Sequence, residues 1–114
     1  MARGYVLRYA ERYEEAREVF LAAHKAFEAE KGEKLLILEA KEEAAWCLTL
    51  SGQCVRGLDE TNDVISILDE MEDADERKAQ AWWRAGRALW DRRGKPGEHF
   101  RVEVQFVYLP LIVR

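Results

Sequence analysis

The sequence is poor in the residues that would cross-link it, bind zinc or anchor it in a membrane. Its two cysteines, Cys47 and Cys54, are seven residues apart, which is about 10 Å of rise along a helix and too far for a disulfide. No cluster of cysteine and histidine has the spacing of a zinc site. The longest apolar runs, at 35–38 and 106–113, are far shorter than the roughly 20 residues of a transmembrane helix. The first residues also lack the apolar stretch of a signal peptide, so we expect a reduced, cytoplasmic protein that does not associate with a membrane.

An excess of positive charge is also lacking. The 18 basic and 22 acidic residues give a formal net charge of −4, which argues against a nucleic-acid partner because nucleic-acid binding relies on basic surfaces. A small polyphosphate stays compatible, since a bound cation can reverse the local sign of the field. The 114 residues are enough for one domain, and 48% hydrophobic with 35% charged residues is an ordinary globular composition.

Apolar residues recur at steps of three and four through four segments, the spacing that places them on one face of a helix. The helices that this spacing predicts end near Gly32, Gly52 and Gly94 and cover residues 5–31, 33–51, 58–72 and 74–93. We therefore expect an all-α fold, an antiparallel four-helix bundle within a domain of residues 1–98. The second segment is apolar on nearly every side. Three neighbouring helices of a small monomer would not cover all of this apolar surface, so we predict a homodimer or a larger homo-oligomer.

The C-terminal segment has a different period. Val102, Val104, Phe106 and Tyr108 alternate with polar residues, and alternation is typical of a strand. A single strand has no partner in an otherwise helical chain. We expect residues 99–114 to form an extended tail that either pairs across a dimer or lies along the helices.

Two acidic pairs fall on consecutive predicted helices, Glu39-x-x-Glu42 and Glu60-x-x-Asp63. A spacing of three puts both members of a pair on one helix face, and a short link makes the two helices antiparallel neighbours. The same spacing also occurs between residues 11 and 18, but there the acids lie opposite the apolar stripe, whereas Glu39, Glu42 and Glu60 fall within theirs. Converging carboxylates repel one another, and a hard divalent cation such as Mg²⁺ would relieve that repulsion.

These segments resemble the all-α nucleoside triphosphate pyrophosphatases, the MazG-like and dimeric dUTPase-like superfamily. The stretch 32–46, GEKLLILEAKEEAAW, is similar to the first metal-binding helix of that family, and the stretch 58–71, LDETNDVISILDEM, is similar to the second. The resemblance covers about residues 15 to 75. It implies hydrolysis of a nucleoside triphosphate to a monophosphate and pyrophosphate, with Mg²⁺, or Mn²⁺ in its place, as the cofactor.

The resemblance also implies a role for individual residues. The metal ligands would be Glu39, Glu42, Glu60 and Asp63, with Glu43 as an auxiliary ligand or catalytic base. Binding of the triphosphate would use Lys78, Arg84 and Arg87, and Trp46 would stack on the base. The alternative for the three basic residues is a solvated surface or ion pairs to glutamates, and the alternative for Trp46 is a place in the core.

A second resemblance predicts a different class of protein. The pattern Tyr13-Glu-Glu-Ala16-x-x-x-Phe20-x-x-Ala23 is similar to the second helix of a tetratricopeptide repeat, and Gly52 and Gly94, 42 residues apart, each close a tryptophan-bearing helix. Paired antiparallel helices would follow, forming a protein–protein interaction module without catalysis. That hypothesis leaves the acids on the core faces of the second and third helices unexplained.

Overall fold

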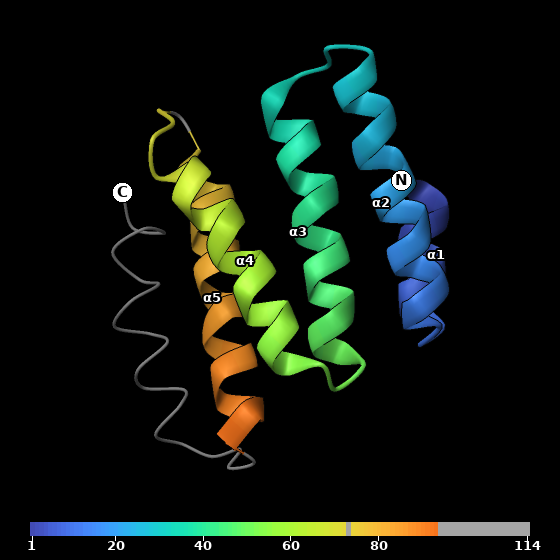
Figure 1. Cartoon of the computed structure of the whole chain (residues 1–114), viewed down its shortest axis with the longest axis vertical. Helices are drawn as coiled ribbons and strands as arrows, with labels where there is room; N and C mark the ends of the chain where they lie inside the picture. Colours follow the sequence, from blue (N-terminus) through green and yellow to red (C-terminus); the bar gives the residue numbers. More distant parts are fainter. Residues whose placement is uncertain (73, 94–114) are drawn as a thin grey trace.

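The computed structural model describes residues 1–72 and 74–93, which form five α-helices (Figure 1). They are α1 (Ala2–Tyr9), α2 (Tyr13–Ala29), α3 (Lys34–Leu50), α4 (Cys54–Leu68) and α5 (Asp75–Arg93). The predicted all-α bundle is confirmed, with five helices in place of four, whereas the predicted tail at 99–114 lies outside the described residues. None of the five described helices is long and apolar enough to cross a membrane.

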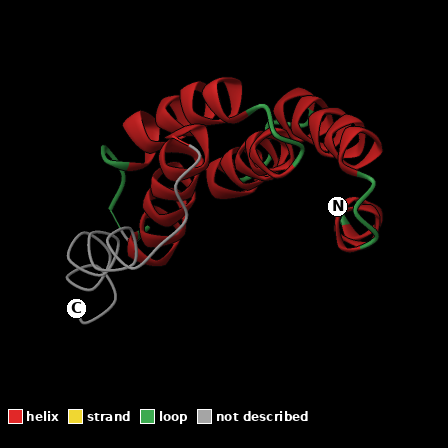
Figure 2. Ribbon diagram, turned by 90° about the horizontal axis from the view of Figure 1, so that it is seen from below, coloured by secondary structure: helices red, strands yellow, loops and turns green. Residues whose placement is uncertain are grey.

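The helices pack mainly on their neighbours in the chain. α2 packs on α1 and α3, α4 packs on α3 and α5, and a smaller contact joins α3 to α5. Seen along the helices, α2 and α4 lie on one side and α1 and α5 on the other, with α3 between them (Figure 2). The bundle is therefore a curved array of two layers.

Because α3 is central, the core has two parts. One hydrophobic cluster, which includes Leu38, Val64 and Leu68, joins α3 to α4 and α5. The other, which includes Phe20, Ala44 and Cys47, joins α3 to α1 and α2. These contacts within one chain account for an α3 that is apolar on nearly every side, so this composition does not by itself require a second copy.

The first predicted helix is two helices because the chain turns after Tyr9. Glu11 adopts a left-handed backbone conformation with φ of 61°, and the N–H groups of Glu11 and Arg12 donate to the carbonyls of Arg8 and Leu7. This paired arrangement is the Schellman motif, which usually places glycine at the left-handed position. A glutamate there gives no sequence signal, so the prediction of one helix over 5–31 was wrong.

α4 begins at Cys54, four residues before the start of the predicted helix 58–72. Gly57 suggested a link between helices, but it lies in the first turn of α4 and is buried. A Cβ atom there would overlap Thr49 Oγ1 and approach the Ala45 carbonyl oxygen to 3.1 Å. The glycine thus lets the backbones of α3 and α4 come close together and does not end a helix.

Candidate functional site

The most strongly buried charges of the described chain lie where α3 meets α5. Glu42 and Glu43 are buried side chains of α3. Arg84 of α5 donates through Nη1 to Glu43 Oε1 at 2.9 Å and to Glu42 Oε1 at 3.2 Å. Arg77, two turns earlier on α5, donates through Nε to Glu42 Oε2 at 2.8 Å. Both buried carboxylates are therefore compensated by arginines from another helix.

The first helix contacts the same side of α3. The hydroxyl of Tyr5 donates to Glu39 Oε1 at 2.8 Å, and Arg8 Nη1 lies 3.6 Å from Glu43 Oε2. Arg77 Nη1 is 3.8 Å from Glu39 Oε1. We call this set the arginine–glutamate cluster, and its members are Arg8, Glu39, Glu42, Glu43, Arg77 and Arg84. With three positive and three negative side chains it is close to neutral, and it joins α1, α3 and α5.

Burial has the largest effect on the pKa values of Glu42 and of Tyr5 beside it. Burial raises the pKa of the Glu42 carboxyl, and the nearby Arg84 and Arg77, which act in the opposite direction, do not cancel this effect. The pKa of the Tyr5 hydroxyl is also raised, first by burial and then by its hydrogen bond to Glu39. Tyr5 therefore stays protonated and acts as a hydrogen-bond donor.

The second acidic pair is separate from this cluster. Glu60 accepts two hydrogen bonds from Arg17 of α2, at 3.0 and 2.9 Å, and the same guanidinium donates to the Ala44 carbonyl. Asp63 is exposed. The four predicted metal ligands therefore do not meet as one group in this arrangement. Within residues 1–72 and 74–93, no three histidine, cysteine or acidic side chains are grouped so that they could hold a metal ion.

The other predicted site residues also have defined contacts. Lys78 donates to the Met71 carbonyl at 2.9 Å, and Arg87 pairs with Asp91 in the same exposed helix turn. Trp46 is buried, with its ring 5.8 Å from that of Trp83 and the Arg84 guanidinium 5.1 Å from its centre. Of the predicted substrate-binding residues, Arg84 and Trp46 thus lie together, whereas Lys78 and Arg87 are engaged elsewhere.

Three arginines that the sequence analysis did not single out belong to these networks: Arg8, Arg17 and Arg77. A signal for Arg77 exists in the sequence, because Arg77 and Arg84 are seven residues apart and so share one face of α5. Arg8 and Arg17 come from helices distant in the chain, and no local pattern marks them.

A pocket of about 350 Å³ opens at the edge of the cluster, between α3 and α5. Its lining combines apolar, acidic, basic and amide side chains: Leu35, Glu39, Ala74, Glu76, Arg77 and Gln80. The arginines and carboxylates beside it already neutralise one another, so the site offers shape and hydrogen bonding more than net charge. Comparisons with family models, curated proteins and solved structures give no match to this chain.

Proposed function

We propose that this chain is a helical-repeat module, similar to tetratricopeptide repeats, that binds a segment of another protein and has no catalytic activity of its own. The observation that supports the proposal is the order of packing, in which each described helix stacks on its neighbours in the chain to form two layers. Repeat proteins are built in this way, because each unit covers only the hydrophobic face of the next. α1 with α2 would be one repeat and α3 with α4 the next, with α5 as the first helix of a third unit.

The arginine–glutamate cluster fits this proposal. The difficulty with a repeat protein was the presence of acids on core faces, which need a counter-charge. The arginines that compensate them come from α1 and α5, the helices equivalent to α3 in the neighbouring units. In the other layer, Arg17 of α2 pairs with Glu60 of α4 in the same way. The buried charges thus act as links between repeats.

The binding surface would lie on the side of α3 that faces α1 and α5. The pocket between α3 and α5 is within the usual size range of ligand pockets, roughly 300–1,000 Å³, although at its lower end. A pocket of this size holds one or two side chains of a bound peptide. Glu39, Arg77 and Gln80 in its lining can hydrogen-bond with a peptide backbone.

Selection from a random peptide library, followed by measurement of dissociation constants, tests this proposal. Gln80→Trp would fill the pocket, and we expect it to weaken the selected peptides by about tenfold or more, which is about 1.4 kcal/mol. Asn62→Trp, at an exposed position of α4, is the matched control and should change affinity less than about twofold. Equal effects of the two variants, or the absence of any binding peptide, would contradict the proposal.

Hydrolysis of a nucleoside triphosphate with Mg²⁺ or Mn²⁺ is the second proposal. It is favoured by the gathering of Glu39, Glu42 and Glu43 on one side of α3, with Arg77 and Arg84 beside them. A site with all the predicted ligands would also require Glu60 to leave Arg17. Pyrophosphate release from a panel of nucleotides, with wild type and Glu60→Gln side by side, decides the matter. No release, together with no metal-dependent shift in melting temperature, would exclude it.

The proposed location is the cytoplasm. Cys47 and Cys54 are both free and buried, as is usual for thiols of proteins in reducing compartments. Measuring where the tagged protein accumulates in intact cells would test this directly.

A further inference from the structure

Two guanidinium groups approach the buried carboxylate of Glu43 without forming a hydrogen bond at these positions. Arg8 Nη1 of α1 lies 3.6 Å from Glu43 Oε2, and Arg77 Nη2 of α5 lies 3.5 Å from Glu43 Oε1. An N–H···O hydrogen bond usually spans about 2.7–3.2 Å. Both separations are longer than this, and polar groups at such a distance are often joined by a water molecule between them.

Three buried polar atoms of these same groups have no hydrogen-bond partner within residues 1–72 and 74–93. They are Arg8 Nε, Glu43 Oε2 and Arg77 Nη2, and they come from three different helices, α1, α3 and α5. The Glu43 side chain is only 3% exposed, so bulk solvent does not hydrate this oxygen. Buried polar atoms without a partner are rare because they are costly. Three of them on groups that face one another therefore indicate a small bound molecule.

The three atoms define the chemistry of that molecule. The two guanidinium N–H groups require an acceptor, and the carboxylate oxygen requires a donor. An anion would be repelled by Glu43 and could not donate to it, and a cation could not accept from Arg8 or Arg77. A water molecule can accept from both arginines and donate to the glutamate, and about three hydrogen bonds are usual for a buried water. Being neutral, it also keeps the arginine–glutamate cluster balanced at three positive and three negative side chains.

We propose that one water molecule is bound between Arg8, Glu43 and Arg77 and bridges α1 to α3 and α5. The guanidinium of Arg8 is held in place for this contact, because its centre lies 5.5 Å and 5.2 Å from the rings of Tyr5 and Tyr9. α1 packs mainly on α2, so the bridge adds an attachment of α1 to the central helix. The water site belongs to the fold itself, and the proposal holds whichever proposed function is correct.

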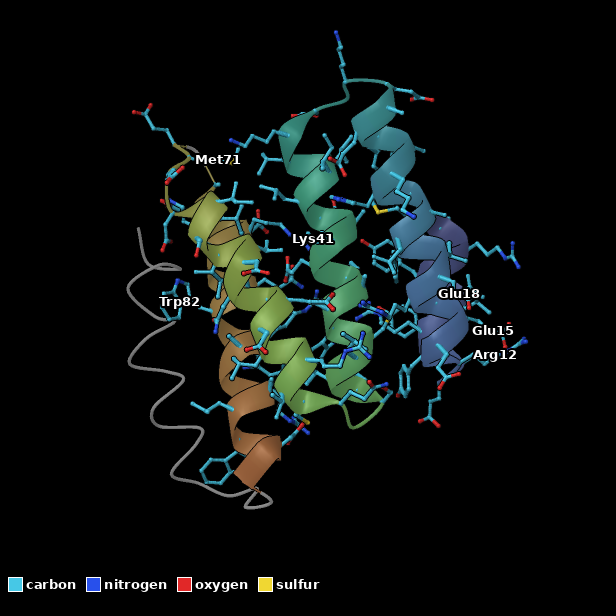
Figure 3. All side chains as sticks on the ribbon, in the orientation of Figure 1. Arg12, Glu15, Glu18, Lys41, Met71 and Trp82 are labelled. Atoms are coloured by element: carbon cyan, nitrogen blue, oxygen red, sulfur yellow. The ribbon has the colours of Figure 1, made fainter. Side chains whose placement is uncertain are left out.

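Nuclear magnetic resonance of the full chain with isotope-labelled arginine tests the proposal in solution. The Arg8 Nε–H should show cross-relaxation with a water molecule that stays bound for longer than the protein takes to tumble. Arg12 is the matched control, because its side chain is 58% exposed and pairs with Glu15 at the edge of the molecule (Figure 3). Its Nε–H should show only exchange with bulk water. The proposal is overturned if the Arg8 Nε–H exchanges as fast as that of Arg12 or shows no bound water.

Crystal structures of the wild type and of two variants locate the water. In the wild type it should lie within hydrogen-bonding distance of Arg8 Nε, Glu43 Oε2 and Arg77 Nη2. Arg8→Met removes one of the three partners and places an apolar side chain of similar length beside the site, so the water should be lost, whereas Arg12→Met should retain it. A direct hydrogen bond from Arg8 to Glu43 in the wild type would overturn the proposal. Retention of the water in Arg8→Met, or an anion at its position, shown by the anomalous signal of bromide, would equally overturn it.

Discussion

Replacing Arg84 with leucine should destabilise the domain by about 3 kcal/mol, because it removes the guanidinium that two buried carboxylates share. Arg84 is only 5% exposed, and its guanidinium donates to both Glu42 and Glu43. Leucine would fill part of the same space, so the lost charge dominates the effect.

The magnitude follows from what remains in the cluster. Removing one partner of a buried ion pair typically costs about 3–5 kcal/mol. Glu42 keeps its 2.8 Å contact with Arg77, and Glu43 keeps Arg8 at 3.6 Å. The lower end of the range is therefore expected. That is a large part of the roughly 5–15 kcal/mol that stabilises a typical domain, and it corresponds to a fall of roughly 10–20 °C in melting temperature.

Urea denaturation of wild type and variant measures this cost, and pH separates charge from packing. Burial already raises the pKa of Glu42, and removing Arg84 should raise it further. Protonation of Glu42 as the pH falls then removes the uncompensated charge, so the difference between the two proteins should shrink as the pH is lowered from 7. Arg87→Leu is the matched control, since Arg87 is 46% exposed and its pair with Asp91 is worth less than about 0.5 kcal/mol. If Arg84→Leu costs no more than this control, or if its cost does not depend on pH, the reasoning is refuted.

Three other predictions come from the fold and one from the sequence pattern. Because its pKa is raised, Glu42 contributes stability that is complete below its ordinary pKa of about 4.5 and is lost as the pH rises through the raised pKa. Glu42→Gln should therefore flatten this part of the curve of unfolding free energy against pH. Parallel curves for the two proteins would contradict this. Gly57→Ala should cost about 1–3 kcal/mol in urea denaturation, because the added methyl overlaps Thr49, whereas Ser66→Ala on the exposed side of α4 should change stability by less than about 0.5 kcal/mol. The Cys47 thiol, whose pKa burial raises to about 11, should react with a thiol reagent only as fast as the domain unfolds; rapid labelling of the folded protein would show the opposite. The homodimer or larger assembly that the sequence pattern predicts is tested by light scattering at tens of micromolar, where a monomer with intact helices would count against it.

Most of the helices could be predicted from the sequence because their apolar residues repeat with the helical period. The exceptions have a common cause. The turn that was missed follows α1 and has Glu11 at its left-handed position, with φ of 61°, so composition does not mark it. Gly57 is the opposite case, because it is a glycine that lies within a helix and marks no turn. Local composition predicts a turn only where the backbone demand and the residue preference coincide.

The sequence predicted the burial of the acidic residues of the candidate site but not the residues that pair with them. Placement within an apolar arc correctly predicted that Glu42 is buried and that Glu39 and Glu60 are partly so. The arginines that pair with these acids come from other helices, so the pattern of each helix alone does not reveal them. Arg17 reaches Glu60 across 43 positions of the sequence, and such pairs depend on the packing of whole helices. The Mg²⁺ expected from the sequence stays a prediction, and the counter-charges that the described helices supply are arginines.

The arginines also suggest why α3 carries acids at all. A helix that is apolar on nearly every side can rotate between its neighbours with little change in buried area, so hydrophobic burial alone does not fix its orientation. Any rotation of α3 would carry Glu42 and Glu43 away from Arg84 and Arg77 and leave charges buried without partners. A buried ion pair adds little net stability, because desolvation offsets most of the attraction. Its larger effect here is to penalise the wrong rotations of α3, so that α1 and α5 meet the same side of the central helix and the pocket between α3 and α5 keeps its shape.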